Sequence, residues 1–184
     1  MEFIIEQAKA SDAEALLAFT RKCGSESDNL SFGAEGIPVS VESEAAFLAS
    51  RESSDTGIFL IARNGDEIIG TADYSVFPKK RMSHRGEFGI SVGKAYWNCG
   101  VGTKLLERIL DFAKNTAKSE IVSLEVRSDN RAAIHLYEKF GFQKIGTFKG
   151  FFKISGELVD YDLMELFLLR IPKSESCAGS ESKL

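Results

Sequence analysis

The sequence predicts an α/β protein in which helices alternate with about seven strands. Three observations support this class. Apolar runs of strand length alternate with segments whose apolar residues recur every three or four positions. The dipeptide Asn64-Gly65 separates two apolar runs, which is a strong signal for an antiparallel hairpin. A further strand, Glu87–Val92, is followed by a loop that contains glycine and then by a long helix.

The first half of the chain is predicted to form a strand, two helices and the hairpin. Ser11-Asp12 is a helix-capping pair followed by apolar residues at helical spacing. Residues 24–38 are rich in Gly, Ser, Asp and Asn, so we expect a loop that lies over a site. The expected elements are a strand over 3–6, helices after residue 12 and over 41–50, and strands over 58–62 and 68–74.

The second half begins with a basic connector, residues 78–85, which we interpret either as a solvated loop or as a lip that steers acidic phosphates. A long amphipathic helix opens near Gly102. Ser128 or Asp129 can cap the next helix, and Gly141 is the residue type that ends one. The remaining elements are expected as strands over 121–126, 143–152 and 157–169 and a helix over 130–140.

Composition predicts a single domain over residues 1–172, followed by a polar tail, 173–184, that we expect to be disordered. The formal net charge of −4 argues against nonspecific binding to nucleic acid or to a membrane surface. No apolar run approaches the roughly 20 residues of a membrane span, so we expect a cytoplasmic protein. The final residues Ser182-Lys183-Leu184 leave a peroxisomal address as the alternative. Three widely spaced cysteines indicate reduced thiols rather than a disulfide or metal site.

The loop before the long helix is a candidate phosphate cradle. Gly100-Val101-Gly102 exposes main-chain N–H groups at a helix N-terminus, where unpaired donors and the helix dipole favour an anion. A dinucleotide fingerprint would need a third glycine where Leu105 stands, and a P-loop would need Ser or Thr in place of Ala95. Both of those nucleotide-binding motifs are therefore excluded.

Residues 97–102, Trp-Asn-Cys-Gly-Val-Gly, resemble the pyrophosphate loop of the GNAT acetyltransferases. That loop normally reads Gln/Arg-x-x-Gly-x-Gly/Ala between a strand and a helix. Trp97 departs from the pattern at its first position. We therefore expect one side-chain contact or loop-bracing bond to be missing, although the amide cradle does not depend on it.

A second segment, residues 124–142, resembles the second GNAT signature, Leu-Glu-Val-Arg, Asn, Ala, Leu-Tyr, Gly-Phe. It is especially similar to the bacterial ribosomal-protein-alanine N-acetyltransferases. The resemblance covers roughly residues 85–169 and implies a GNAT fold. In that fold the sheet is mixed and mostly antiparallel, with helices on both faces, and it is splayed between the fourth and fifth strands near Val92. Residues 25–40 and 150–160 do not resemble those ribosomal-protein enzymes, so the acceptor stays open.

The resemblance implies an N-acetyltransferase that uses acetyl-CoA as co-substrate and no metal. The acceptor would be a primary amine, either a small-molecule amine or a peptide or protein N-terminus. The alternative is a non-catalytic module that binds acyl-CoA and regulates another protein. A homodimer is a reasonable expectation for a small enzyme.

Two residues carry the predicted catalysis. Glu125 is a carboxylate within an apolar strand, so its pKa should be raised and it could act as the general base, directly or through water. Its alternative is a strand glutamate paired with Lys or Arg, and Glu87 is the rival base. Tyr137 is the expected proton donor to the departing thiolate, with a core aromatic as the alternative.

The cofactor-binding residues fall into three groups. Ile90, Ser91 and Val92 should offer main-chain groups to the pantetheine arm, or else pair ordinarily within the sheet. Asn130 should hold the cofactor by its side chain, or else serve only as a helix cap. The amides expected around the pyrophosphate belong to Asn98, Cys99, Gly100, Val101, Gly102 and Thr103. A covalent role for Cys99 is not favoured, because no motif links it to a histidine.

Overall fold

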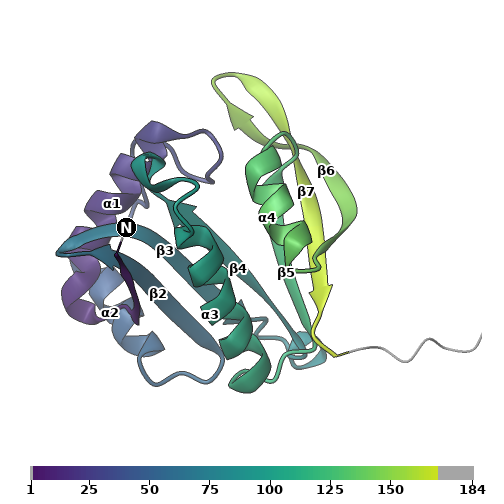
Figure 1. Ribbon diagram of the computed structural model, residues 1–184, viewed down its shortest axis with the longest axis horizontal. Helices are drawn as coiled ribbons and strands as arrows, with labels where there is room; N and C mark the ends of the chain where they lie inside the picture. The colour runs from purple at the N-terminus through teal and green to yellow at the C-terminus, as the bar shows by residue number, and fades with distance from the viewer. Residues whose placement is uncertain (1, 170–184) are drawn as a thin grey trace, which may run out of the picture.

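The computed structural model describes residues 2–169, which form one seven-stranded sheet flanked by four α-helices (Figure 1). The strand order is β1-β2-β3-β4-β5-β7-β6, and every neighbouring pair is antiparallel except β4 and β5. The strands are β1 (Ile4–Gln7), β2 (Gly57–Asn64), β3 (Glu67–Val76), β4 (Arg85–Val92), β5 (Ile121–Arg127), β6 (Gln143–Ile154) and β7 (Glu157–Phe167). The helices are α1 (Ala13–Glu26), α2 (Val41–Arg51), α3 (Val101–Asn115) and α4 (Arg131–Lys139).

Helices cover both faces of the sheet, as predicted. On one face α1 and α2 bury Leu16, Phe19 and Leu48 against Phe59 and Ile61 of β2. On the other face α3 and α4 share the larger core, whose fully buried α3 members are Leu105, Leu106, Ile109 and Ala113. This apolar stripe at helical spacing is the reason that α3 lies flat across the middle of the sheet.

The sheet is splayed between β4 and β5, which confirms the predicted position of the opening. These two parallel strands pair only where Arg85–Glu87 meets Ile121–Ser123. Beyond Glu87, β4 continues to Val92 while paired with β3 alone. Figure 1 shows the two strands together at one end and apart at the other, with α3 and α4 on either side of the gap. One edge of β4 is therefore unpaired over its second half.

Three predicted turns are confirmed by backbone geometry. Gly65 in the β2–β3 hairpin has φ of 59°, and Gly141 after α4 has φ of 93°. Ser155 and Gly156 in the β6–β7 turn both have positive φ, at 51° and 89°. These left-handed conformations are the ones that Gly-containing hairpins and helix ends require.

One predicted boundary was wrong for an identifiable reason. The loop was expected to begin at Gly24, but α1 continues to Glu26. Gly24 lies so close to the next segment that a Cβ there would approach the carbonyl oxygen of Gly33 to 1.9 Å. The glycine therefore permits close packing rather than ending the helix.

The helix caps also differ from expectation. Asp12 ends a short 3-10 turn, Ala10–Asp12, and its carboxylate accepts from the Lys9 amide at 2.8 Å and pairs with Arg63 at 2.5 Å. At α4 the cap is Asn130, the alternative role considered for it, and not Ser128 or Asp129, because its Oδ1 accepts from the Ala133 amide at 3.2 Å.

The remaining expectations concern the ends of the chain. No helix within residues 2–169 is long and apolar enough to cross a membrane. Cys23 and Cys99 are free thiols, whereas Cys177 lies outside the described residues. The predicted tail 173–184 and its terminal Ser182–Leu184 signal also lie outside them.

Candidate active site

A cleft of about 800 Å³ lies where β4 and β5 separate. Its lining comes from the loop after α1, from β3 and β4, from the loop before α3, and from β5, α4, β6 and β7. The cleft brings together nearly every residue that the sequence singled out. These are Ile90, Ser91, Val92, Asn98, Gly100, Val101, Gly102, Thr103, Glu125, Asn130 and Tyr137. Cys99 is the predicted site residue that does not line it.

The N-terminus of α3 presents free amides to the cleft. Gly100 caps the helix with φ of 85°, and the first intrahelical bond runs from the Lys104 amide to the Gly100 carbonyl at 3.0 Å. The amides of Val101, Gly102 and Thr103 precede that bond and so have no helical acceptor. The Cys99 amide is instead directed at the Tyr96 carbonyl, at 3.4 Å. Of the amides predicted for the cradle, that of Cys99 is directed away to a main-chain partner.

Trp97 supplies the brace that its departure from the family pattern was expected to remove. Its indole Nε1 donates to the Val92 carbonyl oxygen at 2.8 Å. This bond joins the end of β4 to the loop before α3 across the short 3-10 turn Lys94–Tyr96. An indole N–H can donate, so this loop has a side-chain brace although Trp97 departs from the family pattern.

Along the unpaired edge of β4, only some residues direct their main-chain groups toward the opening. The Gly93 amide donates to the Ile69 carbonyl at 3.0 Å, so Gly93 points toward β3. Main-chain directions alternate along a strand, so Ser91 also faces β3 while Ile90 and Val92 face the opening. Ile90 and Val92 therefore offer main-chain groups to a ligand, and Ser91 contributes only lining surface.

Tyr137 of α4 has features of both roles considered from the sequence, the core aromatic and the donor in the site. Its ring packs edge-on against Phe88 and Phe142, with ring centroids 5.8 and 6.0 Å away. Its hydroxyl makes no hydrogen bond to any described residue, although the side chain is 8% exposed and lines the cleft. Burial raises the pKa of this phenol to about 12. The ring is core, and the hydroxyl stays protonated at neutral pH.

Glu125 of β5 lies on the sheet face that α1 and α2 cover, opposite Leu163 of β7. Burial, and then the negative charge of Glu87, raise the pKa of Glu125. No ion pair to Glu125 occurs within the described part of the chain, so the cross-strand pairing considered from sequence does not form. Glu87 of β4 also lines the cleft.

Asp73 is a site residue that the sequence reasoning missed. It lies on β3 opposite Gly89 of β4, and it lines the cleft. Burial raises the pKa of Asp73 to about 6, with the nearby Arg51 opposing that rise and Glu87 adding to it. The signal was available, because Asp73 interrupts an apolar strand in the same way as Glu125 does. Tyr161 of β7 also lines the cleft and was not singled out.

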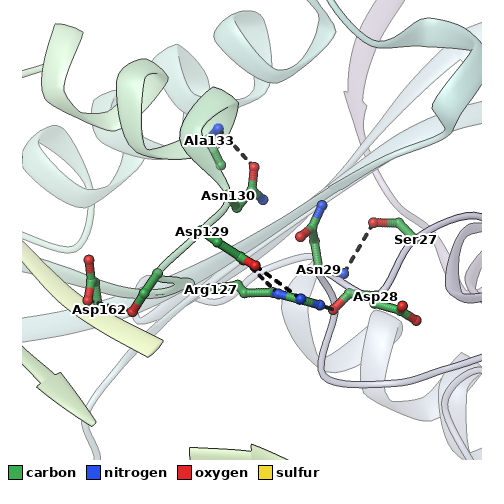
Figure 2. A network of polar contacts seen from close by, with 9 residues as sticks. Ser27, Asp28, Asn29, Arg127, Asp129, Asn130, Ala133 and Asp162 are labelled. Carbon is green, nitrogen blue, oxygen red and sulfur yellow. Dashed lines mark hydrogen bonds and ion pairs between the residues drawn. The ribbon is translucent and has the colours of Figure 1, made fainter. Parts of the chain in front are cut away.

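A polar strap joins β5 to the loop after α1, whose Ser27 and Asn29 line the cleft (Figure 2). Arg127 donates to both carboxylate oxygens of Asp129, at 2.7 and 3.1 Å, and to the Asp28 carbonyl at 3.2 Å. Asn130 lies beside this strap with Oδ1 used by the helix cap, which leaves its Nδ2 free to donate. The loop predicted to lie over a site does so, and Arg127 fastens it.

The basic connector does not form a lip on this cleft. It leads into the start of β4, and the cradle lies beyond the other end, about 23 Å away at the usual rise per residue. None of its residues lines the cleft, and Arg85 pairs with Glu165 of β7. Its interpretation as a surface loop is therefore the better one. No cluster of side chains suited to a metal ion occurs among residues 2–169.

The free amides, the open strand edge and the unpartnered phenol lie along one cleft, an arrangement suited to an elongated anionic ligand. Sequence comparison identifies the family: the model of the Acetyltransferase (GNAT) family matches residues 26–142. The chain belongs to that family.

Two curated relatives and one solved structure illustrate the relationship. N-alpha-acetyltransferase RimI of Mycobacterium tuberculosis is 37% identical over 52% of this chain, and L-amino acid N-acetyltransferase AaaT of Escherichia coli is 33% identical over 55% of it. These alignments cover 58% and 62% of the two relatives' own lengths. A GNAT acetyltransferase from Streptococcus pneumoniae is 34% identical, covers 91% of this chain and 100% of its own, and superposes with a TM-score of 0.87.

Proposed function

We propose that this protein transfers the acetyl group of acetyl-CoA to a primary amine, either a small-molecule amine or a peptide N-terminus, by direct attack. One observation carries the proposal. The open edge of β4 leads within a single cleft from the amide cradle at α3 to the carboxylates and the phenol of Tyr137. Family membership and the N-acetyltransferase names of the relatives support the same reaction.

The chain's own groups fit this co-substrate. The free amides of Val101, Gly102 and Thr103 would hold the pyrophosphate, and Ile90 and Val92 would hold the pantetheine arm as an added strand. Nδ2 of Asn130 would donate to the cofactor. Bound acetyl-CoA supplies an acetyl group already activated as a thioester.

Glu125 is our first candidate for the general base. An α-amino group has a pKa near 7.7–8.0 and a lysine amine near 10.4, so the acceptor must lose a proton before it can attack. The raised pKa of Glu125 makes it a stronger base than an ordinary carboxylate. Glu87 or a water chain between the two carboxylates could take the same proton.

Tyr137 would act as a hydrogen-bond donor to the departing sulfur. Its pKa of about 12 lies well above the value near 8.5 of a free thiol. Complete proton transfer from the phenol to a thiolate is therefore uphill by roughly 5 kcal/mol. A donated hydrogen bond stabilises the developing negative charge without that transfer.

The test is a release assay with the full chain, acetyl-CoA and a panel of amines and peptides, in which free thiol and acetylated product are both measured. Amine-dependent thiol release with matching product supports the proposal. Binding of CoA without release for any acceptor would favour the non-catalytic module. No interaction with CoA at millimolar concentration would contradict both. The homodimer also remains a prediction, and sedimentation of the full chain tests it.

A further inference from the structure

We infer that the acceptor end of this cleft selects an amine that carries a second positive charge, held between Asp73 and Glu87 while the reacting nitrogen lies at Glu125. The inference rests on the proposed function, because it names the class of acceptor for that same site. Three features of the site support this class of acceptor: the placement of three carboxylates, the shortage of cations around them, and an unpartnered hydroxyl beside them.

The three carboxylates lie on one face of the sheet at neighbouring positions. Asp73 pairs with Gly89, and Glu87 lies two residues before Gly89 on the same strand. Glu87 pairs with Ser123, and Glu125 lies two residues beyond Ser123. Because side chains two residues apart share a face, Asp73, Glu87 and Glu125 form one row across β3, β4 and β5.

Gly89 carries no side chain in the middle of this row. A Cβ built on Gly89 would lie 3.1 Å from Oδ1 of Asp73, so the Asp73 carboxylate extends over the glycine. Adjacent strands lie about 4.8 Å apart, so β3 and β5 are separated by about 10 Å or more at this level. That span suits an acceptor with two separated nitrogens rather than a single ammonium group.

Cations are scarce around these carboxylates. Among the described residues that line the cleft, Lys139 is the single Lys or Arg, and it lies on α4. Arg51 faces Asp73 from α2, but its guanidinium donates to the Ser75 hydroxyl at 2.9 Å and lies over the ring of Phe47. Asp73 forms no ion pair or hydrogen bond with another side chain described in the structure. A cationic ligand would supply the missing partner.

Tyr161 gives an independent indication of a ligand. Its side chain is only 4% exposed, and its hydroxyl has no hydrogen-bond partner among the described residues. It lines the cleft and pairs with Arg127 of β5, two residues beyond Glu125, so it shares the face of the three carboxylates. A buried hydroxyl without a partner is unfavourable, and an N–H donor of a bound amine would supply that partner.

The test compares three amines on the same five-carbon chain. Cadaverine carries a second amine at its far end, n-pentylamine carries a methyl group there, and 5-aminopentanol carries an uncharged hydroxyl as the polar control. We expect kcat/KM for cadaverine to exceed that for pentylamine by roughly 10-fold or more at low salt, as expected for one charge-assisted contact. In Asp73→Asn, the ratio of kcat/KM for cadaverine to that for pentylamine should fall close to the ratio of kcat/KM for aminopentanol to that for pentylamine. Glu87→Gln should lower it as well, and Asp66→Asn, the same change in the β2–β3 turn outside the cleft, should leave it unchanged.

A second readout does not depend on turnover. Calorimetric titration of cadaverine and pentylamine into the full chain with CoA measures acceptor binding directly, and CoA affinity confirms that each variant is folded. Tighter binding of cadaverine that Asp73→Asn removes supports the inference even if no amine is acetylated, a result that would count against the proposed function alone. Equal binding of the two amines, or a preference that survives both substitutions, would overturn the inference and leave acetyl transfer standing.

Discussion

The two ends of the cleft are built in different ways. The proposed cofactor end offers main-chain groups from one short stretch of the chain, the end of β4 and the first turn of α3. The acceptor end uses side chains from four strands, with Asp73 on β3 and Tyr161 on β7 at its limits. The cofactor end can be formed by many different sequences, because main-chain amides are placed by the path of the backbone and not by the side chains. The second end depends on each side chain, and it is where this chain can differ from its relatives.

The largest effect on turnover is expected from Tyr137, which lies where the two ends of the cleft meet. Tyr137→Phe removes the hydroxyl and keeps the ring against Phe88 and Phe142, so it should lower kcat by roughly 10²–10⁴ with little change in CoA affinity. Steady-state kinetics and CoA titration measure the two quantities. Tyr96→Phe is the matched control, because Tyr96 also lines the cleft but its hydroxyl donates to Glu67. Near-normal turnover in Tyr137→Phe would remove the assignment.

The next prediction concerns the acceptor end and stability. The pKa of Asp73 is raised to about 6, so above that pH the folded protein holds a buried charge that the unfolded chain would solvate. The folded state binds more protons than the unfolded state between about pH 4 and 6, so this carboxylate lowers stability as pH rises through that window. Asp73→Asn should therefore raise the free energy of unfolding at pH 7, by on the order of 1–3 kcal/mol.

That gain should shrink as pH falls toward 4, because Asp73 of the unmodified chain is then protonated in the folded state and increasingly in the unfolded state as well. Denaturant unfolding at several pH values measures it, and Asp66→Asn should show no such pH-dependent gain. Arg51, Glu87 and Glu44 are the charged groups that influence Asp73, so the measurement should be repeated in Glu87→Gln. If Asp73→Asn were destabilising at pH 7, the acceptor end would owe its carboxylate to structure rather than to a ligand.

A third prediction tests whether the cofactor end depends on backbone path alone. Gly100 has φ of 85° with open space where a Cβ would be, so Gly100→Ala introduces strain but no clash. A left-handed non-glycine residue is unfavourable by about 1–2 kcal/mol, so we expect CoA affinity to fall about 5- to 30-fold. Gly156→Ala in the β6–β7 turn, with φ of 89° and equally open, should change stability without changing CoA affinity. A similar loss in both variants would point to general destabilisation.

The contrast between the ends also explains what the sequence could predict. The Asn64-Gly65 hairpin depends on a local pattern and the splay on the family resemblance, and both were confirmed. Asp73 and Tyr161 could not be placed in the cleft from sequence, because only the strand register puts them on the face of Glu125. A register is set by pairing between distant segments, and a shift of one residue would turn every side chain to the other face.

Local patterns also misled in identifiable ways. Gly24 looks like a loop start until Gly33 is packed against it, and the best-placed side chain for the α4 cap turned out to be Asn130. Trp97 looked like a lost contact because the motif specifies residue types rather than the bond that they make.

The smallest effect is expected from loss of the hydrogen bond between Trp97 Nε1 and the Val92 carbonyl oxygen. Trp97→Phe keeps an aromatic ring but removes the Nε1 donor to the Val92 carbonyl, and an exposed hydrogen bond contributes about 0.5–1.5 kcal/mol. We expect CoA affinity to fall by roughly 2- to 10-fold, because the loop before α3 is then less firmly fixed to the end of β4. Trp97→Gln, the usual family residue, should recover most of the loss if a side-chain donor is what the position requires. Calorimetric titration of CoA into both variants separates the cases: equal affinity in Trp97→Phe and the unmodified chain would mean that the cofactor end needs no brace, and a loss in both variants would mean that it needs the indole itself.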